Sequence, residues 1–241
     1  MKKNLLILGG TSGLMLNMIE TFQKSFNITL TYSNKKNLQL TNFSKLQKIK
    51  FLKINLLDNE DKIISILKKN KVKADVIINA VGGSFGVKGY PFKITDWKKV
   101  LDLNILKHIS INNYFLKKMI KNRFGRILYF STSGVDTAGT AVPYSASKAF
   151  LENYVKKSAL EFGKFNVLIN CIKTSIIVAK NNNWYKASIS KPQMVKKLVK
   201  EKISVERYGK ADDLESFVNL IISDKNKFMN GSIVSIDGGF K

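Results

Sequence analysis

Apolar residues are distributed along the chain in two alternating patterns. Short apolar runs are typical of buried strands in a parallel sheet, and they occupy residues 4–8, 28–32, 51–55, 76–79, 126–131, 165–172 and 232–236. Segments with an apolar residue every three or four positions are typical of helices packed on a sheet, and they cover 14–22, 56–69, 95–122, 143–161 and 211–223. The alternation predicts an α/β fold, a doubly wound parallel sheet of about seven strands with helices on both faces.

The domain organisation follows from the same pattern. No linker, repeat or low-complexity segment interrupts it, so we expect residues 1–241 to form a single domain. One stretch departs from the alternation: residues 174–205 follow the sixth strand, have helical periodicity and contain Trp184, Tyr185 and Met194. We interpret this stretch as a helical flap beside a substrate site, and 95–122 as one or two consecutive helices.

The first predicted strand runs directly into a glycine turn, Gly9-Gly10-Thr11-Ser12-Gly13, and a helix follows from Leu14. Such a turn exposes backbone N–H groups that bind a pyrophosphate, and the helix dipole adds to the attraction. After the second strand, Ser33-Asn34-Lys35-Lys36 contains no acid. An acid at this point binds the ribose 2′-hydroxyl of NAD, whereas small polar and basic residues accommodate the 2′-phosphate of NADP. The sequence therefore predicts a dinucleotide site that favours NADP (NADPH) over NAD.

A candidate proton-transfer pair lies at the start of the helix predicted for 143–161. Tyr144 and Lys148 are four residues apart and therefore lie on one face of that helix. An ammonium beside a phenol favours the phenolate, so we expect Lys148 to lower the pKa of Tyr144. Tyr144 could then exchange a proton with a substrate oxygen at neutral pH. Alone, this spacing favours a surface pair, because it arises often by chance in a lysine-rich chain, so the surrounding motifs decide.

Those motifs make the chain resemble the short-chain dehydrogenase/reductase family of the compact kind, and in particular its 3-oxoacyl-carrier-protein reductases. Tyr144-Ser145-Ala146-Ser147-Lys148 matches the family's Tyr-x-Ala-Ser-Lys segment. Supporting matches, in the family's order and spacing, are Asn79-Ala80, the Asn104 helix, Gly125-Arg126-Ile127, Asn170 and Asp237-Gly238-Gly239. The resemblance covers essentially the whole chain. It implies a Rossmann-like fold and an NADP(H)-dependent oxidoreductase that interconverts a carbonyl and a secondary alcohol.

The resemblance also implies a role for each catalytic residue. Tyr144 would be the general acid in carbonyl reduction and the base in alcohol oxidation. Lys148 would hydrogen-bond the nicotinamide ribose and keep the pKa of Tyr144 low. Asn104 would hold a water in a proton relay, although it also fits a core asparagine that kinks a helix. Hydride transfer itself would belong to the cofactor.

A hydroxyl at the end of the fifth strand would polarise the substrate carbonyl. Counting back from Tyr144 by the family's interval gives Ser131, and Gly134 then lies three residues after the hydroxyl residue, as expected for the family. Counting forward from Gly125-Arg126 gives Thr132 instead. Both stay open, with a slight preference for Ser131, and Ser133 is a third candidate.

The cofactor site implied by the resemblance takes residues from several strand ends. Its expected members are Gly9, Thr11, Ser12, Gly13, Leu14, Ser33, Asn34, Lys35, Asn55, Leu56, Asn79, Ala80, Val81, Tyr144, Lys148, Thr174 and Ile177. Four departures from the family bear on cofactor affinity and flap geometry. Met15 replaces a third glycine and should crowd the helix–strand packing, Asn55 replaces an aspartate, Val81 a glycine, and Thr174-Ser175 a Pro-Gly turn.

The net charge of +24 raises the question of nucleic acid binding. Arginine stands only at positions 123, 126 and 207, which leaves 38 of the 41 basic residues as lysine. Arginine is the preferred partner of phosphates and base edges, and these lysines are spread along the chain rather than clustered. We therefore interpret the charge as a solvated surface and expect no nucleic acid partner.

Other classes of protein are disfavoured too. The single cysteine, Cys171, forms no disulfide framework and fits a cytoplasmic location. No apolar run approaches the ~20 residues of a membrane span, so we expect no membrane association. The only histidine, His108, reads as a packing or surface residue, and no cluster has metal-ligand spacing, so we expect no metal.

Two classes of small-molecule carbonyl or alcohol substrate remain open. A carrier-bound 3-oxoacyl chain would suit the basic surface, because acyl carrier proteins are acidic. A sugar-like or other small polar metabolite would suit a flap that carries Lys180, Asn181, Asn182 and Asn183. The alternative function is a non-catalytic dinucleotide-binding protein, a redox sensor or structural subunit.

The resemblance further implies self-association. The helices at 104–122 and 143–161 usually pair across subunits in this family, which gives a homodimer or homotetramer. Phe115, Phe150 and Tyr154 are the apolar residues on these helices that we expect at such a contact.

Overall fold

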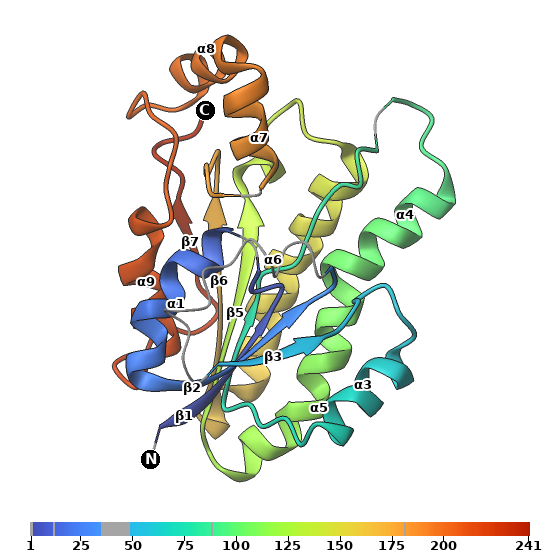
Figure 1. Cartoon of the computed structure of the whole chain (residues 1–241), viewed down its shortest axis with the longest axis vertical. Coiled ribbons are helices and arrows are strands. Elements are labelled where there is room, and N and C mark those ends of the chain that lie inside the picture. Colours follow the sequence, from blue (N-terminus) through green and yellow to red (C-terminus); the bar gives the residue numbers. More distant parts are fainter. Residues whose placement is uncertain (1, 12, 35–48, 88, 181) are drawn as a thin grey trace.

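The computed structural model of the chain describes residues 2–11, 13–34, 49–87, 89–180 and 182–241. At its centre is a seven-stranded sheet in the order β3-β2-β1-β4-β5-β6-β7, with all neighbouring strands parallel. The strands are β1 (Lys3–Leu8), β2 (Phe26–Tyr32), β3 (Lys50–Lys53), β4 (Val76–Asn79), β5 (Gly125–Thr132), β6 (Val167–Thr174) and β7 (Ile233–Ile236). The predicted doubly wound parallel sheet is confirmed (Figure 1).

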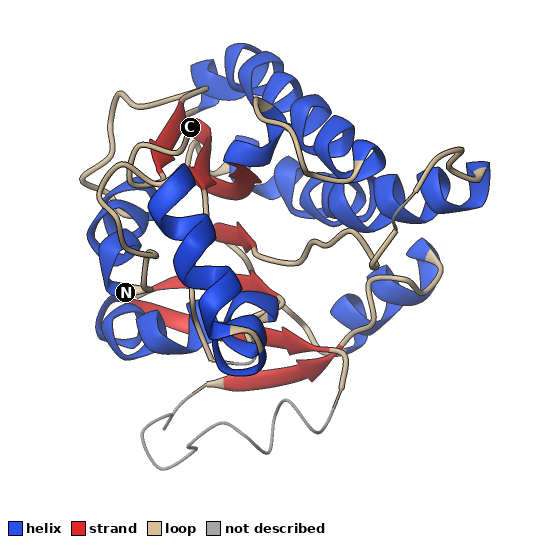
Figure 2. Cartoon of the chain, turned by 90° about the horizontal axis from the view of Figure 1, so that it is seen from above, coloured by secondary structure: helices blue, strands red, loops and turns tan. Residues whose placement is uncertain are grey.

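Helices cover both faces of this sheet (Figure 2). One face carries α1 (Gly13–Ser25) and α9 (Asp212–Ile222), and the other carries α3 (Glu60–Lys69), α5 (Lys107–Lys121) and α6 (Val142–Phe162). No helix in the described part of the chain is long and apolar enough to cross a membrane.

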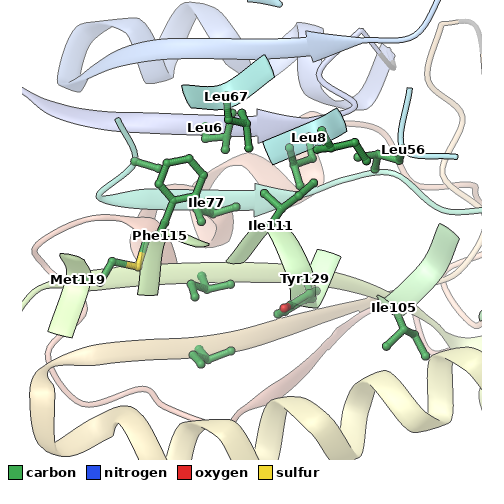
Figure 3. Close-up of a cluster of buried hydrophobic side chains, with 14 of the residues drawn as sticks. Leu6, Leu8, Leu56, Leu67, Ile77, Ile105, Ile111, Phe115, Met119 and Tyr129 are labelled. Atoms are coloured by element: carbon green, nitrogen blue, oxygen red, sulfur yellow. The ribbon is translucent and has the colours of Figure 1, made fainter. Parts of the chain in front are cut away.

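Each face of the sheet has its own hydrophobic core. Leu6 and Leu8 of β1 join the cluster beneath α3, α5 and α6, whereas Leu5 and Ile7 join the cluster beneath α1 and α9. Figure 3 shows the first cluster, in which Phe115 of α5 lies among the buried side chains of the sheet. Because both faces are covered, strand residues of either parity are buried, and this explains the unbroken apolar runs.

Helix α3 begins at Glu60, so the prediction that it begins at Leu56 is wrong. The side chain of Asn59 caps the helix by accepting a hydrogen bond from the N–H of Asp61 at 2.8 Å. Before it, Asn55 accepts a bond from the backbone N–H two residues later, at 3.1 Å, which holds a turn instead of a helix.

The region predicted as one or two helices over 95–122 is two helices joined by an irregular turn. Helix α4 (Ile94–Leu101) passes through a π-helical segment, Asp102–Leu106, directly into α5. Such π turns redirect a side chain within a continuous helix and are frequent at functional sites. Here the redirected residue is Asn104.

The predicted flap is helical and consists of α7 (Asn183–Ser190) and α8 (Pro192–Lys202). It has a small core of its own, formed by Ile176, Val195, Val199 and Ile203. The flap lies at the end of the sheet toward which β5 and β6 point (Figure 1). It therefore stands over the carboxyl ends of these strands, where ligands bind in parallel α/β sheets.

Candidate active site

A cleft lies at the carboxyl ends of the strands, beside the point where the strand order reverses between β1 and β4. It consists of two neighbouring cavities of about 360 and 1010 Å³, and Gly82 lines both. The first cavity lies over the ends of β1 to β4. The second extends across β5 and β6 to the start of α6 and the flap. An elongated ligand that occupies both cavities would therefore pass Gly82.

The first cavity brings together many of the residues predicted to bind the cofactor. Its lining includes Gly9, Thr11, Ser33, Asn55, Leu56, Ala80 and Val81. Asn34 follows Ser33 and is exposed, while Ser12, Lys35 and Asn181 lie outside the described residues. The lining residues that the sequence did not single out include Tyr32, Leu57, Phe85 and Leu103. These four are apolar or aromatic and carry no cofactor motif.

The glycine turn closes tightly against the neighbouring strand end. Gly9 has φ +78°, a conformation that favours glycine, and a Cβ there would lie 2.3 Å from Cγ2 of Val81. Gly13 meets the foot of the flap, because a Cβ there would lie 1.9 Å from the carbonyl oxygen of Lys180. Met15 was expected to crowd the packing, but its side chain is fully buried within the core under α1. The turn thus keeps its shape without the third glycine.

Tyr144 and Lys148 lie together on α6. Tyr144 lines the second cavity, and the Nζ atom of Lys148 lies 5.8 Å from the centre of its ring. The same Nζ donates a hydrogen bond to the carbonyl of Phe130 at 2.8 Å. The helix is held in place by a buried stripe at three- and four-residue spacing, and proline occupies its first turn. The spacing inferred from sequence thus places both side chains toward the cleft.

Burial dominates the ionisation of this pair. It raises the pKa of Tyr144 to about 12 and lowers that of Lys148 from 10.5 to about 8. The expectation that Lys148 lowers the pKa of Tyr144 is therefore wrong for this structure, because loss of hydration outweighs the ammonium at this separation. At neutral pH Tyr144 is protonated, which is the state that a proton donor to a carbonyl oxygen requires.

Asn104 lies behind Gly82, beside Lys148. Its side chain is buried, its Nδ2 donates to the carbonyls of Val100 (2.8 Å) and Gly83 (2.9 Å), and its Oδ1 accepts from the N–H of Gly83 (3.0 Å). A Cβ on Gly82 would lie 2.7 Å from Oδ1 of Asn104 and 3.1 Å from Nζ of Lys148. The π turn and Gly82 together therefore let these two side chains converge.

The two candidate hydroxyls at the end of β5 have different partners. Ser131 donates its proton to Oε1 of Glu152 on α6, at 2.6 Å. The oxygen of Thr132 accepts a bond from the N–H of Gly134 at 3.2 Å, which leaves the Thr132 proton for another acceptor. Both residues line the second cavity with Tyr144. Thr132 is thus the residue with a proton to donate there.

The foot of the flap is fixed to the C-terminal segment. Ser133 donates to the Asp237 carboxylate at 2.7 Å, and Ser175 donates to the Asp237 carbonyl at 2.6 Å. Ser133 is therefore committed to a structural contact. Thr174 ends β6, two residues beyond the predicted strand end. Of the predicted cofactor residues, the second cavity includes Leu14, Tyr144, Thr174 and Ile177.

His108 supports the end of β4. Its Nδ1 lies 2.9 Å from Oδ1 of Asn79, and its Nε2 lies 3.0 Å from the carbonyl of Val81. Burial and the charge of Lys148 lower its pKa to about 3, so the imidazole is neutral. The packing role predicted for His108 agrees with these contacts. Asn79 is buried by them, and it does not contribute to the lining of either cavity, although it was predicted to bind the cofactor.

Two charged residues next to the site were not singled out from the sequence. The Nζ atom of Lys173 lies 3.2 Å from Oε2 of Glu152 and 2.7 Å from Oδ2 of Asp136. Glu152 follows Lys148 by four residues on the same helix face, and Lys173 pairs in register with Ser131. These two spacings were the features of the sequence from which Glu152 and Lys173 could have been identified. Within the described ranges, no group of three or more His, Cys, Asp or Glu residues could hold a metal ion.

Comparison with known proteins finds relatives of this chain. A family model described as enoyl-(acyl carrier protein) reductase matches residues 21–241. The 3-oxoacyl-[acyl-carrier-protein] reductase FabG of Aquifex aeolicus is 28% identical over 166 residues, which are 68% of this chain and 64% of that protein.

Two solved structures are similar over nearly the whole chain. The structure of 4-hydroxyisoleucine dehydrogenase complexed with NADH has a TM-score of 0.86 at 27% identity and covers 99% of this chain and 98% of that chain. ElxO with NADP bound has a TM-score of 0.84 at 25% identity, with the same coverage.

Proposed function

The chain belongs to the short-chain dehydrogenase/reductase family of NAD(P)-dependent oxidoreductases, and we propose that it interconverts a carbonyl and a secondary alcohol with NADP(H). The observation that carries this proposal is the convergence of three side chains at the joint between the two cavities. Tyr144 lines the second cavity, and Lys148 and Asn104 meet behind Gly82. A drifted, non-catalytic relative would be expected to lose this set first.

The residues of the cleft fit a dinucleotide. A strand, a glycine turn and the start of α1 form the arrangement in which a helix N-terminus binds a pyrophosphate, and the two adjoining cavities match an elongated ligand. When bound, the nicotinamide supplies or takes up the hydride at the carbonyl carbon. Lys148 would hydrogen-bond its ribose, and Leu14, Thr174 and Ile177 would enclose its end of the cleft.

In the reductive direction, Tyr144 gives its phenolic proton to the substrate oxygen as that oxygen gains the electron pair of the C=O bond. The phenolate is then reprotonated through Lys148, with Asn104 holding a water in the relay. Alcohol oxidation runs through the same groups in reverse. Thr132 donates a hydrogen bond to the same substrate oxygen and stabilises the charge that develops on it. Ser131 donates its hydrogen bond to Glu152 and so connects β5 to α6 next to the site.

The cofactor preference that we propose is NADP. Ser33 lines the first cavity at the end of β2, where an acid would select the 2′-hydroxyl of NAD, and no acid stands there. ElxO, a structural relative, has NADP bound, whereas 4-hydroxyisoleucine dehydrogenase is complexed with NADH. Similarity to these two proteins does not distinguish the cofactors, so the preference for NADP rests on Ser33 at the end of β2.

The proposed substrate is a small polar carbonyl compound. The side chains around the second cavity that are neither catalytic nor assigned to the cofactor carry mostly hydroxyl, amide and aromatic groups, and include Ser84, Tyr90, Phe92, Thr140, Asn182, Asn183 and Trp184. Hydroxyls and amides can bind substrate hydroxyls, and aromatic faces pack on the C–H faces of small rings. A carrier-bound 3-oxoacyl substrate, as the name of FabG indicates for that protein, is the competing class.

For self-association, the structure changes the residues that we propose. Phe115 is buried in the core and is not free for a partner, and Tyr154 is partly buried against Tyr129, with ring centres 6.1 Å apart. Phe150 on α6 is 52% exposed and remains available. We propose a homodimer or homotetramer that uses this helix face, and light scattering that gives the monomer mass of 27.2 kDa would contradict it.

The test uses NADPH and NADH with wild type and Tyr144→Phe. Both proteins should bind NADPH more tightly than NADH in calorimetry, because the phenol oxygen is not a main determinant of affinity. Oxidation of NADPH is then followed with a neutral ketose such as erythrulose and with acetoacetyl-N-acetylcysteamine as a 3-oxoacyl thioester. Turnover should fall by about 10²- to 10⁴-fold in the mutant. Absence of dinucleotide binding would overturn the proposal, and turnover of the thioester alone would overturn the substrate class.

A further inference from the structure

A chain of charged and polar side chains links β5 and α6, which carry Thr132, Tyr144 and Lys148, to the neighbouring strand β6. Glu152 of α6 uses both of its carboxylate oxygens: Oε1 accepts the proton of Ser131 at 2.6 Å, and Oε2 lies 3.2 Å from Nζ of Lys173. Lys173 of β6 extends the chain to Asp136, which follows β5, at 2.7 Å. The network therefore connects β5, β6 and α6 directly beneath the second cavity.

The central pair of this network is nearly inaccessible to water. The side chains of Glu152 and Lys173 are 12% and 11% exposed, whereas that of Asp136 is 65% exposed. A buried ion pair is a poor source of stability, because desolvation of both charges offsets most of their attraction. The position of the Glu152–Lys173 ion pair is therefore better explained by its effect on the neighbouring residues of the active site than by a gain in stability.

We propose that Glu152 and Lys173 are positioning residues of the active site. Glu152 accepts a hydrogen bond from Ser131, which leaves Thr132 as the hydroxyl that faces the substrate, and the ion pair with Lys173 holds this carboxylate one helical turn from Lys148. Lys148 and Glu152 are four residues apart on the face of α6 that packs on the sheet, so the carboxylate favours the charged form of the lysine. This inference rests on the roles proposed above for Tyr144 and Lys148.

Several other titratable groups face this part of the site. From β6 come Cys171 and Lys173, from α5 comes His108, from β5 comes Tyr129, and from the loop after β5 comes Asp136. Burial keeps the Cys171 thiol neutral by raising its pKa to about 12, and it also raises the pKa of Tyr129, so both are uncharged at neutral pH. His108 is neutral as described above. Of the charged groups in this network, Glu152 is therefore the one that acts directly on Lys148, and Lys173 and Asp136 act through their ion pairs with it and with each other.

The charge of Glu152 one helical turn from Lys148 sets the direction in which substitutions in the network should move the pKa of Lys148. Burial lowers the pKa of Lys148 to about 8, and the interactions with Cys171 and then with Glu152 oppose that shift. Removal of the negative charge of Glu152 should lower the pKa of Lys148 further. Removal of Lys173 should raise it, because the charge of Glu152 is then no longer offset. Loosened packing would move both variants in one direction.

The experiment measures the titration of Lys148 without turnover. Trace acetylation with acetic anhydride, quantified by mass spectrometry of the peptide that contains Lys148, gives its reactivity as a function of pH. In Glu152→Gln, which keeps an acceptor for Ser131, the midpoint should fall by about one pH unit. In Lys173→Gln the midpoint should rise. Each variant is first shown to be folded by circular dichroism.

The matched control is Glu201→Gln on α8. Glu201 pairs with Lys197 at 3.9 Å on the surface, so this variant makes the same chemical change far from the site and should leave the midpoint of Lys148 unchanged. An unchanged midpoint in folded Glu152→Gln, or shifts of equal sign in both network variants, would overturn the inference. If Glu152→Gln does not fold, the titration midpoint of Lys148 in Lys173→Gln still tests the inference: a rise supports it, and no rise overturns it. Because no substrate is used, failure here is distinct from failure of the proposed function, which the dinucleotide-binding and turnover assays report.

Discussion

The two ends of the cleft are built in different ways. Around the first cavity, at the ends of β1 to β4, much of the wall is backbone, glycine, and short or apolar side chains. Around the second cavity, polar side chains of β5, β6 and α6 are cross-linked to one another, as Ser131 is to Glu152 and Glu152 to Lys173. Of the departures from the family, Asn55 and Val81 line the first cavity, whereas Thr174-Ser175 lines the second. The catalytic set stands at the second.

The contrast between the two ends indicates which parts of the sequence are free to vary. Backbone N–H groups and the shape of a turn bind a dinucleotide whatever the neighbouring side chains are, so Met15 can become part of the core without loss of the turn. Proton transfer requires particular functional groups within hydrogen-bond reach. We therefore expect substitutions at the catalytic end to have larger effects than substitutions at the cofactor end.

A large effect on turnover is expected from the hydroxyl of Thr132. Thr132→Val keeps the shape of the side chain and removes the hydroxyl, and kcat/KM for carbonyl reduction should fall by about 10²- to 10³-fold. In Ser131→Ala, kcat/KM should fall by less than about tenfold, because the hydroxyl of Ser131 donates its hydrogen bond to Glu152 and not to the substrate. Steady-state kinetics with NADPH distinguishes the two, and Thr132→Ser, which restores the hydroxyl and the bond from Gly134, should recover most of the activity. A larger loss in Ser131→Ala would return the role to Ser131.

The next effect is expected at the joint between the two ends. In Gly82→Ala the new methyl would lie 2.7 Å from Oδ1 of Asn104 and 3.1 Å from Nζ of Lys148, so both side chains must move. A displacement of this kind should lower kcat by about 10- to 100-fold. Gly83→Ala is the matched control, because a Cβ at Gly83 meets nothing within 4 Å. Equal losses in the two variants would point to a general effect on the loop.

A third effect concerns stability at the catalytic end. Burial lowers the pKa of Lys148 from 10.5 to about 8, so below pH 8 the folded state carries a poorly solvated charge. Lys148→Met should therefore raise the free energy of unfolding at pH 7 by about 1–3 kcal/mol while it abolishes activity.

The pH dependence of that gain has a definite sign. Between pH 8 and 10.5 the unfolded chain holds the Lys148 proton and the folded chain does not, so the wild type becomes relatively more stable as the pH rises. The advantage of Lys148→Met should shrink over this range. Urea unfolding at pH 7 and pH 10 measures it, with the exposed Lys197→Met as the control. A constant advantage at both pH values would show that packing rather than charge is responsible.

Much of the fold and part of the site could be predicted from the sequence. Strands buried on both faces read as unbroken apolar runs, and this placed all seven strands close to their observed bounds. The four-residue spacing of Tyr144 and Lys148 placed both on one face of α6 because helical periodicity is local. Residues such as Gly9 and Thr11 followed from their position at a strand end.

What could not be predicted depends on contacts between elements distant in sequence. Loss of hydration sets the pKa of Tyr144, and it is a property of the packed fold rather than of the neighbouring Lys148. The partner of Ser131 is on another element, so counting along the chain could not separate Ser131 from Thr132. Phe115 had the pattern of a surface apolar residue on a helix, but α5 directs it into the core.

The smallest of the expected effects tests the cofactor end. Ser33 lines the first cavity at the end of β2, where the 2′-phosphate of NADP would lie under the proposed function. Ser33→Asp adds a negative charge there and should weaken NADPH binding by about tenfold, or ~1.4 kcal/mol, with little change for NADH. Calorimetry at low and moderate salt measures both affinities. Asn27→Asp adds the same charge at the exposed opposite end of β2 and serves as the control.

The salt dependence of this last effect separates two explanations of the cofactor end. If the carboxylate introduced by Ser33→Asp repels the 2′-phosphate directly, the loss should persist in moderate salt, because charges this close are poorly screened, and Asn27→Asp should show no loss. If both variants weaken NADPH equally and salt removes the effect, the net positive charge of the chain attracts the cofactor and the strand end does not select it. The first cavity would then contribute shape alone, and recognition by side chains would be confined to the catalytic end.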